Sequence, residues 1–195
     1  MGKEKYLKQI EALFKESPVV SANSILRVIK SKKPVRQYHK QLIKNLVLKG
    51  KIKRLSKGCY TMHDEPSLAV FSFNPSYIGL QDALSFYNLW EQEAIPIIIT
   101  SKKARIGIRK ILDTNVLIRR IDRKYFFGFD YKKYGNFYLP VSDIEKTFID
   151  MVYFRQRIDD ELLKEFKRRL NRNRLGGYLK KYPKFMKLRV FNKLK

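Results

Sequence analysis

The feature that most constrains the fold is the pattern of helical and strand-like segments in the N-terminal third of the chain. Three segments have apolar residues at helical spacing, and two strand-like segments follow: 3–15, 25–29, 34–49, 51–55 and 59–62. Ser56-Lys57-Gly58 separates the two strands and supplies a hairpin turn with glycine at its permissive position. Three helices followed by a basic hairpin predict a winged helix-turn-helix.

Local signals support these boundaries. Ser21 or Asn23 can cap the second helix, because a short polar side chain accepts a hydrogen bond from the first turn. Gly50 offers the left-handed residue with which many helices end. Ile52 and Leu55 are three residues apart, so in a regular strand their side chains would point to opposite faces. We therefore expect the turn to begin at Leu55 or the strand to contain a bulge.

The third helix presents a polar face that suits base recognition in the DNA major groove. At about 100° per residue, Val35, His39, Leu42 and Leu46 fall on the side expected to face the core. Glutamine can pair with adenine, arginine with guanine, and lysine neutralises phosphate. The residues predicted to bind DNA lie on the opposite face and on the hairpin: Arg36, Gln37, Tyr38, Lys40, Gln41 and Lys44, then Lys53, Arg54 and Lys57. A solvated helix surface explains this face equally well, and only its combination with the glycine-capped end and the basic hairpin favours DNA binding.

The charge of the chain indicates a polyanionic partner. The sequence has 43 Lys and Arg against 18 Asp and Glu, a formal net charge of +25. Residues 1–65 hold 16 basic and 5 acidic side chains, residues 66–158 hold 14 and 9, and residues 159–195 hold 13 and 4. The excess is therefore concentrated at the two ends, which favours two basic modules over a uniformly charged surface. Because 44% of the residues are hydrophobic, the chain also has enough apolar side chains for a buried core.

After Asp64-Glu65-Pro66, which we expect to be a linker, strand-like and helical segments follow one another. The predicted strands, rich in β-branched and aromatic residues, cover residues 68–73, 95–100, 115–121, 125–131 and 137–141. The predicted helices cover residues 79–90, 143–156, 159–170, 175–182 and 184–194. We therefore expect an α+β protein with a winged helix-turn-helix at 1–65 and a small α+β domain with a helical C-terminal end at 66–195.

The residue patterns on which enzymes depend are scarce. Two histidines and Cys59 cannot build a closed zinc site, and the sequence has neither a phosphate-binding glycine loop nor a dinucleotide fingerprint. We therefore expect no catalytic residue, no cofactor and no metal. The alternative is a metal-dependent nuclease centred on Asp143, Glu145 and Asp150. Against it, Glu145 and Asp150 lie about 140° apart on a helix, and Ser142 with Glu145 fits a helix capping box.

The sequence also predicts where the protein resides. The longest apolar stretch, residues 95–99, is far shorter than the roughly 18 residues of a membrane span, and the charged first residues do not fit a signal peptide. A single cysteine fits a reducing compartment. We therefore expect a cytoplasmic protein that makes no membrane contact.

Four segments carry a resemblance to a known family. They are Leu46 to Tyr60 with Gly50, Ile52, Leu55 and Gly58, then Asp82-Ala83-Leu84-Ser85 through Leu89, Phe127-Gly128, and Val141-Ser142-Asp143-Ile144-Glu145-Lys146-Thr147 followed by Asp150. In order and spacing the chain resembles the AbiEi-type antitoxins, the predicted regulators of bacterial and archaeal abortive-infection toxin–antitoxin systems. The resemblance covers roughly residues 5–185, with Asp82 where the family prefers Ser and Asn88 where it usually has Gly.

The resemblance implies a protein with two roles. Its winged helix would repress its own operon by binding repeats in the promoter, and its second domain would counter a nucleotidyltransferase-like toxin without forming a stable complex. The acidic motif then has no catalytic role, because the chemistry belongs to the toxin. We therefore expect a sequence-specific double-stranded DNA-binding regulator and antitoxin. The alternatives are a nuclease targeted by the winged helix and an RNA-binding protein, which the charge alone fits equally well.

Overall fold

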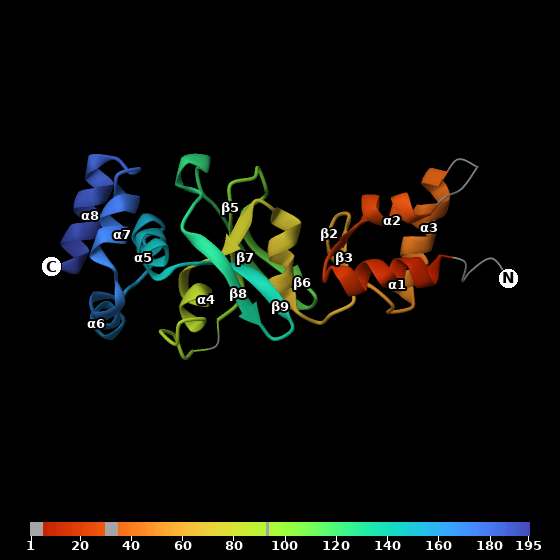
Figure 1. Cartoon of the computed structure of the whole chain (residues 1–195), viewed down its shortest axis with the longest axis horizontal. Helices are drawn as coiled ribbons and strands as arrows, with labels where there is room; N and C mark the ends of the chain where they lie inside the picture. Colours follow the sequence, from red (N-terminus) through yellow and green to blue (C-terminus); the bar gives the residue numbers. More distant parts are fainter. Residues whose placement is uncertain (1–5, 30–34, 93) are drawn as a thin grey trace. The chain divides into compact units, whose positions relative to one another are not determined.

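The computed structural model describes residues 6–29, 35–92 and 94–195, with the side chains of residues 35–38 left out (Figure 1). The chain divides into two compact units, each with a hydrophobic core of its own. The N-terminal unit comprises residues 1–72 and 110–114, and the C-terminal unit comprises residues 73–109 and 115–195. The fold is α+β with a helical C-terminal end, as the sequence predicts, and its larger sheet is mixed.

The N-terminal unit combines helices with a small antiparallel sheet. Its elements are α1 (Leu7–Glu16), β1 (Val20–Ser21), α2 (Ala22–Val28), α3 (Val35–Leu48), β2 (Lys53–Ser56) and β3 (Cys59–Thr61), followed by the 3₁₀ helix η1 (Pro66–Phe73). Strand β3 pairs antiparallel with both β1 and β2, so the order across the sheet is β1-β3-β2. The β2–β3 register shifts between Arg54 and Ser56, and this bulge allows both Ile52 and Leu55 to be buried.

One apolar side of each helix forms the core of the N-terminal unit. The buried residues of this core are Ile10, Phe14, Val20, Ile25, Ile29, Ile43, Leu46 and Ile52. Of the two predicted caps of α2, Ser21 and Asn23, Ser21 is the N-cap, because its hydroxyl accepts a hydrogen bond from the backbone N–H of Ser24 at 3.0 Å. Ser21 is both the last residue of β1 and the N-cap of α2, so the short helix follows the sheet without a connecting loop.

The remaining elements build a larger sheet and its helices. In chain order they are β4 (Ser76–Ile78), α4 (Leu80–Ser85), β5 (Ile97–Thr100), β6 (Gly107–Ile111), β7 (Thr114–Arg120), η2 (Arg123–Tyr125), β8 (Phe129–Tyr134), β9 (Phe137–Ser142), α5 (Ile144–Tyr153), α6 (Asp160–Arg169), α7 (Arg172–Leu179) and α8 (Lys184–Leu194). The described strands form a six-stranded sheet in the order β6-β7-β5-β4-β9-β8. Strands β4 and β9, and also β5 and β7, pair parallel, whereas β4–β5 and β8–β9 are antiparallel.

The C-terminal helices gather on one side of this sheet (Figure 1). Helix α5 is the centre of the group, since its residues Phe148, Ile149 and Met151 are completely buried. They share a core with side chains from the strands and from every later helix: Tyr77, Ile97, Ile99, Leu162, Phe166, Leu175, Leu179, Met186 and Val190. Within the described part of the chain, no helix combines the length and the apolar character that crossing a membrane requires.

Three sequence predictions of secondary structure need correction. Residues 68–73 were expected to form a strand, but they belong to η1, whose first residue Pro66 suits a helix start. This segment is apolar except for Ser72 and lacks the regular alternation that identifies a strand, so its periodicity does not decide between the two structures. The helix expected at 79–90 ends at Ser85, and the strand expected at 125–131 begins at Phe129 because η2 precedes it.

Candidate nucleic-acid interface

Helix α3 is the element on which most of the predicted site residues lie. Ile43 and Leu46 are buried in the core of the N-terminal unit, and they determine which side of the helix faces solvent. The helix ends as predicted, with Gly50 at a φ of +66°. The backbone N–H of Gly50 donates to Val47 O at 3.0 Å and that of Lys51 donates to Leu46 O at 2.9 Å, the paired bonds of a Schellman motif. The end of α3 and the start of the hairpin are therefore held in one arrangement.

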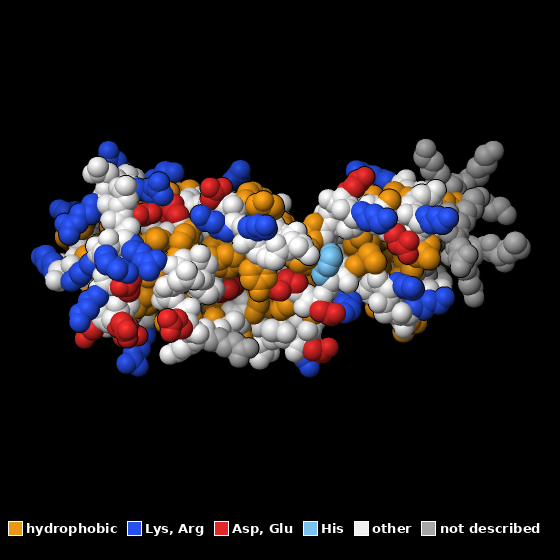
Figure 2. Space-filling model, turned by 60° about the horizontal axis from the view of Figure 1, so that its bottom comes forward, with side chains coloured by type: hydrophobic (Ala, Val, Ile, Leu, Met, Phe, Trp, Pro, Cys, Tyr) orange, Lys and Arg blue, Asp and Glu red, His pale blue; other side chains and the backbone are white. Residues whose placement is uncertain are grey.

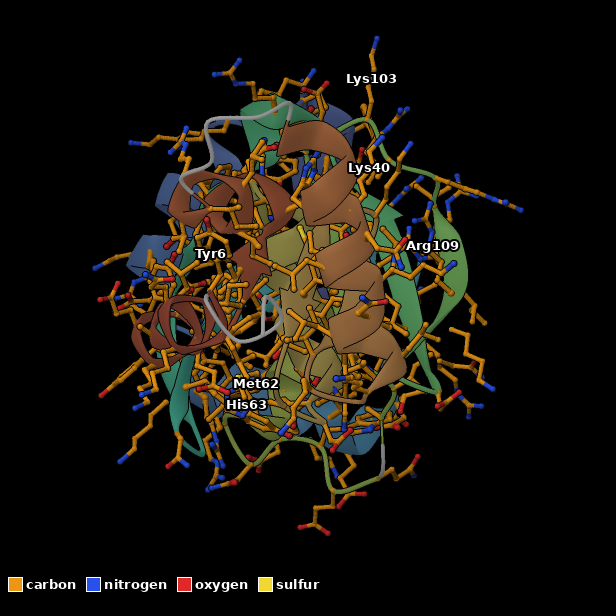
Figure 3. All side chains as sticks on the ribbon, turned by 90° about the vertical axis from the view of Figure 1, so that its right-hand side faces the viewer. Tyr6, Lys40, Met62, His63, Lys103 and Arg109 are labelled. Carbon is orange, nitrogen blue, oxygen red and sulfur yellow. The ribbon has the colours of Figure 1, made fainter. Side chains whose placement is uncertain are left out.

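A groove runs between α3 and the β2–β3 hairpin. Its volume is about 400 Å³, and it is lined by Ala22, His39, Lys40, Ile43, Lys44, Val47, Leu48, Arg54 and Tyr60. Arg54 and Tyr60 lie opposite each other on β2 and β3, so both side chains point to the same face of the hairpin. The lining is apolar along Ile43 and Val47 and carries the cations of Lys40, Lys44 and Arg54. Figure 3 shows Lys40 on α3.

The structure thus brings three of the predicted site residues together: Lys40 and Lys44 from α3 and Arg54 from the hairpin. Gln41 is exposed beside them, and its Nε2 donates a hydrogen bond to Asn45 Oδ1 at 3.0 Å. This bond holds the glutamine amide along the helix surface. His39, which the helical pattern places toward the core, is only partly buried and lines the groove.

Two hairpin residues lie apart from this group. Lys53 forms an ion pair with Asp64, and its side chain is only 33% exposed. Because successive strand residues point to opposite faces, Lys53 and Arg54 cannot serve the same surface, and this alternation was already visible in the sequence. Lys57 is exposed in the hairpin turn next to Gly58, whose φ is +81°. Arg36, Gln37 and Tyr38 belong to α3, but their side chains lie outside the described residues.

The sequence prediction missed two properties of this surface. The first is Leu48, which is 74% exposed at the end of α3 and adds an apolar side chain to the polar face. The second is the distribution of charge. Residues 17–63 hold 12 Lys and Arg and no Asp or Glu, so the whole segment that builds α2, α3 and the hairpin is free of acidic side chains. An uninterrupted positive segment raises the local concentration of a polyanion.

A second cluster of charged residues lies inside the C-terminal unit. Lys146 and Asp150, one turn apart on α5, form an ion pair in which both side chains are completely buried. The Tyr77 hydroxyl donates a hydrogen bond to Asp150 Oδ2 at 2.7 Å. The Lys146 ammonium also lies 5.4 Å from the centre of the Tyr77 ring and 5.5 Å from that of Phe127, within cation–π range. A cation, an anion and a phenol therefore satisfy one another without solvent.

Burial determines the protonation behaviour of this cluster. It lowers the pKa of Lys146 and raises the pKa of Asp150, while the mutual attraction of the two groups opposes both changes. Burial also raises the pKa of Tyr77 well above its usual value, with Asp150 adding to the effect. The Asp150 oxygens are engaged by Lys146 and Tyr77. Among the described residues, no group of His, Cys, Asp and Glu is placed to hold a metal ion.

The other carboxylates of this segment hold secondary structure in place. Asp143, not Ser142, is the N-cap of α5, and its Oδ1 accepts a hydrogen bond from the backbone N–H of Lys146 at 2.7 Å. Its other oxygen accepts from the Tyr178 hydroxyl at 2.6 Å. The predicted capping box is therefore wrong, because Glu145 points away and accepts from the backbone N–H of Asn171 at the start of α7, at 2.7 Å.

Gly128 lies against this cluster. Its φ is +72°, and a Cβ added there would lie 2.9 Å from the Lys146 Cβ and 3.0 Å from the Tyr178 ring. Its carbonyl also accepts a hydrogen bond from the backbone N–H of Asp143 at 2.9 Å. The glycine and the acidic motif, which are far apart in the sequence, therefore form one structural unit around the start of α5.

The fold defines an α+β protein of two units with a basic groove on the first unit and a buried ionic cluster in the second. No model of a known protein family matches the sequence, and no curated protein matches it. The crystal structure of the RV2827C protein from Mycobacterium tuberculosis is similar, with a TM-score of 0.60 and 14% sequence identity over 97% of this chain and 75% of that chain. At this identity the likeness shows a shared fold alone.

Proposed function

We propose that the N-terminal unit is a winged helix-turn-helix that binds double-stranded DNA in a sequence-specific manner. The order α1-β1-α2-α3-β2-β3, with β3 between β1 and β2, matches that of winged helices. In such a unit α2 and α3 form the helix-turn-helix, α3 enters the major groove, and the β2–β3 hairpin is the wing. The side of α3 opposite the buried residues Ile43 and Leu46 would then face the duplex.

The observation that carries the proposal is the joint placement of Lys40, Lys44 and Arg54 along one groove of an acid-free segment. Cations from the helix and from the wing then approach the same duplex, where each neutralises a phosphate. Gln41, held by Asn45, and Gln37 supply the amide groups that pair with adenine. Phosphate contacts position α3, and the glutamines provide the base preference.

We further propose that the protein acts as an autorepressor and as the antitoxin of a toxin–antitoxin operon in viral defence. This part rests on the resemblance to the AbiEi-type antitoxins, whose toxin is a nucleotidyltransferase-like protein. The contacts of Asp143, Glu145 and Asp150 favour this role over the nuclease alternative, because each carboxylate already binds protein donors. Incubating the chain and Asp143→Ala with plasmid DNA and Mg²⁺ tests that alternative: cleavage lost in the variant would establish it.

The DNA-binding proposal is tested by selecting preferred duplexes from a random pool and measuring affinity by fluorescence anisotropy. In Lys40→Ala/Lys44→Ala, affinity should fall for every sequence, and the salt dependence should lose about 1.8 in slope, since each neutralised phosphate contributes about 0.9. In Gln37→Ala/Gln41→Ala, base preference should relax by about 1–3 kcal/mol for each lost pair. The same titration with structured RNA decides between DNA and RNA as the ligand.

A matched control uses two exposed lysines on α1 of the same unit, Lys8→Ala/Lys15→Ala, which remove the same charge from a different helix. This variant should bind selected duplexes nearly as tightly as the unchanged chain. If it loses as much affinity as Lys40→Ala/Lys44→Ala, only the net charge matters and α3 is not a recognition helix. Unchanged base preference in the glutamine variant would also contradict the assignment.

A further inference from the structure

The last helices of the chain form a second basic surface that the proposed DNA contact does not use. Residues 171–195 hold nine Lys and Arg and no Asp or Glu. These residues build α7 and α8, and Lys and Arg side chains are spread over the C-terminal helices (Figure 2). Charge alone fits any anion, so the apolar side chains among these cations have to identify the partner.

Helix α8 has apolar side chains on two of its sides. Met186 and Val190 are buried in the core of the C-terminal unit. Phe185, Leu188 and Phe191 are 64%, 53% and 48% exposed, and their spacing of three residues places them along one stripe of the outer side. We call these three side chains the α8 stripe. Leaving two phenylalanines and a leucine in water is unfavourable for a surface that stays uncovered.

The α8 stripe leads into a cavity between α8 and the segment that joins α6 and α7. The cavity has a volume of about 260 Å³, and Phe191, Leu170, Leu175 and Leu194 give it apolar walls. Lys167, Arg172 and Lys195 also line it at its edge, where the Lys167 ammonium donates a hydrogen bond to the Lys195 backbone oxygen at 3.2 Å. This size fits a single large apolar side chain, and a pocket of this kind next to an exposed apolar stripe is the usual arrangement of an interface anchor.

We propose that the α8 stripe and this cavity bind an acidic amphipathic helix of a partner protein. Apolar side chains on one face of that helix cover Phe185 and Leu188, and one of them fills the cavity beside Phe191. Its Asp and Glu residues pair with Lys184 and Arg189 on α8 and with the cations at the cavity edge. Helix-in-groove recognition has this form, with anchors every three or four residues.

Other classes of partner match only part of the combination of exposed apolar stripe, cavity and positive charge. Duplex DNA pairs with the cations but offers no apolar face to cover the α8 stripe. A second copy brings another acid-free segment 171–195, whose cations repel those of the first. A flat anionic bilayer can take up the exposed rings but cannot place a side chain in the cavity between α6, α7 and α8. An acidic amphipathic helix satisfies the stripe, the cavity and the charge together.

The test uses the full chain as bait for a displayed library of helical peptides of varied charge and apolar pattern. Selected peptides should combine Asp or Glu with apolar residues at three- and four-residue spacing. A dye-labelled selected peptide is then titrated by fluorescence anisotropy. Phe185→Ser/Leu188→Ser should weaken its binding by roughly tenfold or more, because anchors dominate an interface. Lys184→Glu/Arg189→Glu should weaken binding as well, and added salt should reduce the affinity of the unchanged chain.

The matched control replaces two exposed isoleucines of the same unit, Ile106→Ser/Ile108→Ser, which are 58% and 66% exposed. Equal loss of peptide affinity in this control would overturn the proposal, as would selection of no peptides or of peptides without acidic residues. The proposal also fails if Phe185→Ser/Leu188→Ser instead lowers binding to phosphatidylserine vesicles or to duplex DNA, or changes the sedimentation mass of the chain. Each of those results assigns the surface to a membrane, to DNA or to a second copy.

Discussion

Replacing Lys146 with Met removes the cation from a completely buried ion pair and leaves the Asp150 carboxylate with the Tyr77 hydroxyl as its remaining described donor. Methionine fills a volume similar to that of lysine, so the change isolates the charge. Removing one partner of a buried ion pair costs about 3–5 kcal/mol, because the other charge stays buried without compensation. We therefore expect Lys146→Met to lower the free energy of unfolding of the C-terminal unit by about that amount at neutral pH.

The loss should depend on pH in a direction that follows from the buried carboxyl. Burial already raises the pKa of Asp150, and loss of the adjacent cation raises it further. When the pKa of a carboxyl is higher in the folded than in the unfolded protein, the protonated group contributes its full stability below the unfolded pKa of about 3.9. The folded state loses this stability as the pH rises through the native pKa. The variant should therefore lose up to about 1.4 kcal/mol per pH unit in that window. A window of roughly two to three pH units therefore gives about 3–4 kcal/mol, which lies within the range expected for a broken buried ion pair.

Urea titration followed by tryptophan fluorescence measures this loss of stability in the C-terminal unit specifically. Trp90 is the single tryptophan of the sequence and packs against the core of the C-terminal unit. Its signal therefore reports the unfolding of that unit, even if the two units unfold separately. The titration should be run at several values from about pH 4, near the unfolded pKa of the carboxyl, to pH 8. Lys146→Met should approach the stability of the unchanged chain at the acidic end.

Two comparisons make the reasoning refutable. In Lys146→Met/Asp150→Asn the buried charge is gone and the amide oxygen still accepts from Tyr77, so about 2 kcal/mol or more should return and the pH dependence should vanish. Lys124→Met breaks an exposed ion pair with Asp122, which solvent screens, and should leave the free energy of unfolding nearly unchanged. A Lys146→Met variant that is no less stable than Lys124→Met, or equally stable at about pH 4 and at pH 8, would refute the reasoning.

The structure makes two further predictions. Gly128→Ala should lower the free energy of unfolding by about 2–4 kcal/mol in the same urea assay, because the left-handed backbone and the contact with Lys146 both oppose a side chain. Gly135→Ala, also left-handed but in open space in the same unit, should cost only about 1 kcal/mol, and an equal cost at both positions would refute the contact. Arg54→Ala should reduce the salt slope of DNA binding by about 1. Lys53→Ala should change it less, because Lys53 is already paired with an aspartate, and the reverse order would contradict the placement of Arg54 in the groove.

The sequence predicted the parts of the N-terminal unit whose signals are local. Ser21 is followed directly by the helix that it caps, and Gly50 and Gly58 adopt the left-handed backbone for which glycine was expected. Because Ile52 and Leu55 are both apolar but three residues apart, the sequence indicated either a turn that begins at Leu55 or a bulge, and the β2–β3 register shifts between Arg54 and Ser56, as the second alternative requires. In each case the interacting residues are neighbours in the chain, so spacing alone contains the information.

Predictions failed where the deciding contact is distant in sequence. A lysine is almost always exposed, and nothing near Lys146 indicated that it is completely buried. Its partner Asp150 is one turn away, but Tyr77, which completes the cluster, lies 73 residues earlier. Glu145 likewise suggested a capping box, whereas its carboxylate accepts a hydrogen bond from the backbone N–H of Asn171 at the start of α7, 26 residues later. Helical spacing cannot reveal these partners.

The contacts around Lys146 and Asp150 also bear on the resemblance to the AbiEi-type antitoxins, because they concern the packing of the C-terminal unit and not the surface of α3. Gly128, Asp143, Lys146 and Asp150 carry much of that resemblance, and all of them belong to the arrangement that orients α5. These positions therefore concern how the C-terminal unit of this chain is packed, and they carry no information about which DNA it would bind. Base preference would be decided on the exposed side of α3, around Gln41, where side chains can change without disturbing any core contact. Two chains with the same buried cluster are thus free to bind different DNA, and the function of each has to be argued from its own surface.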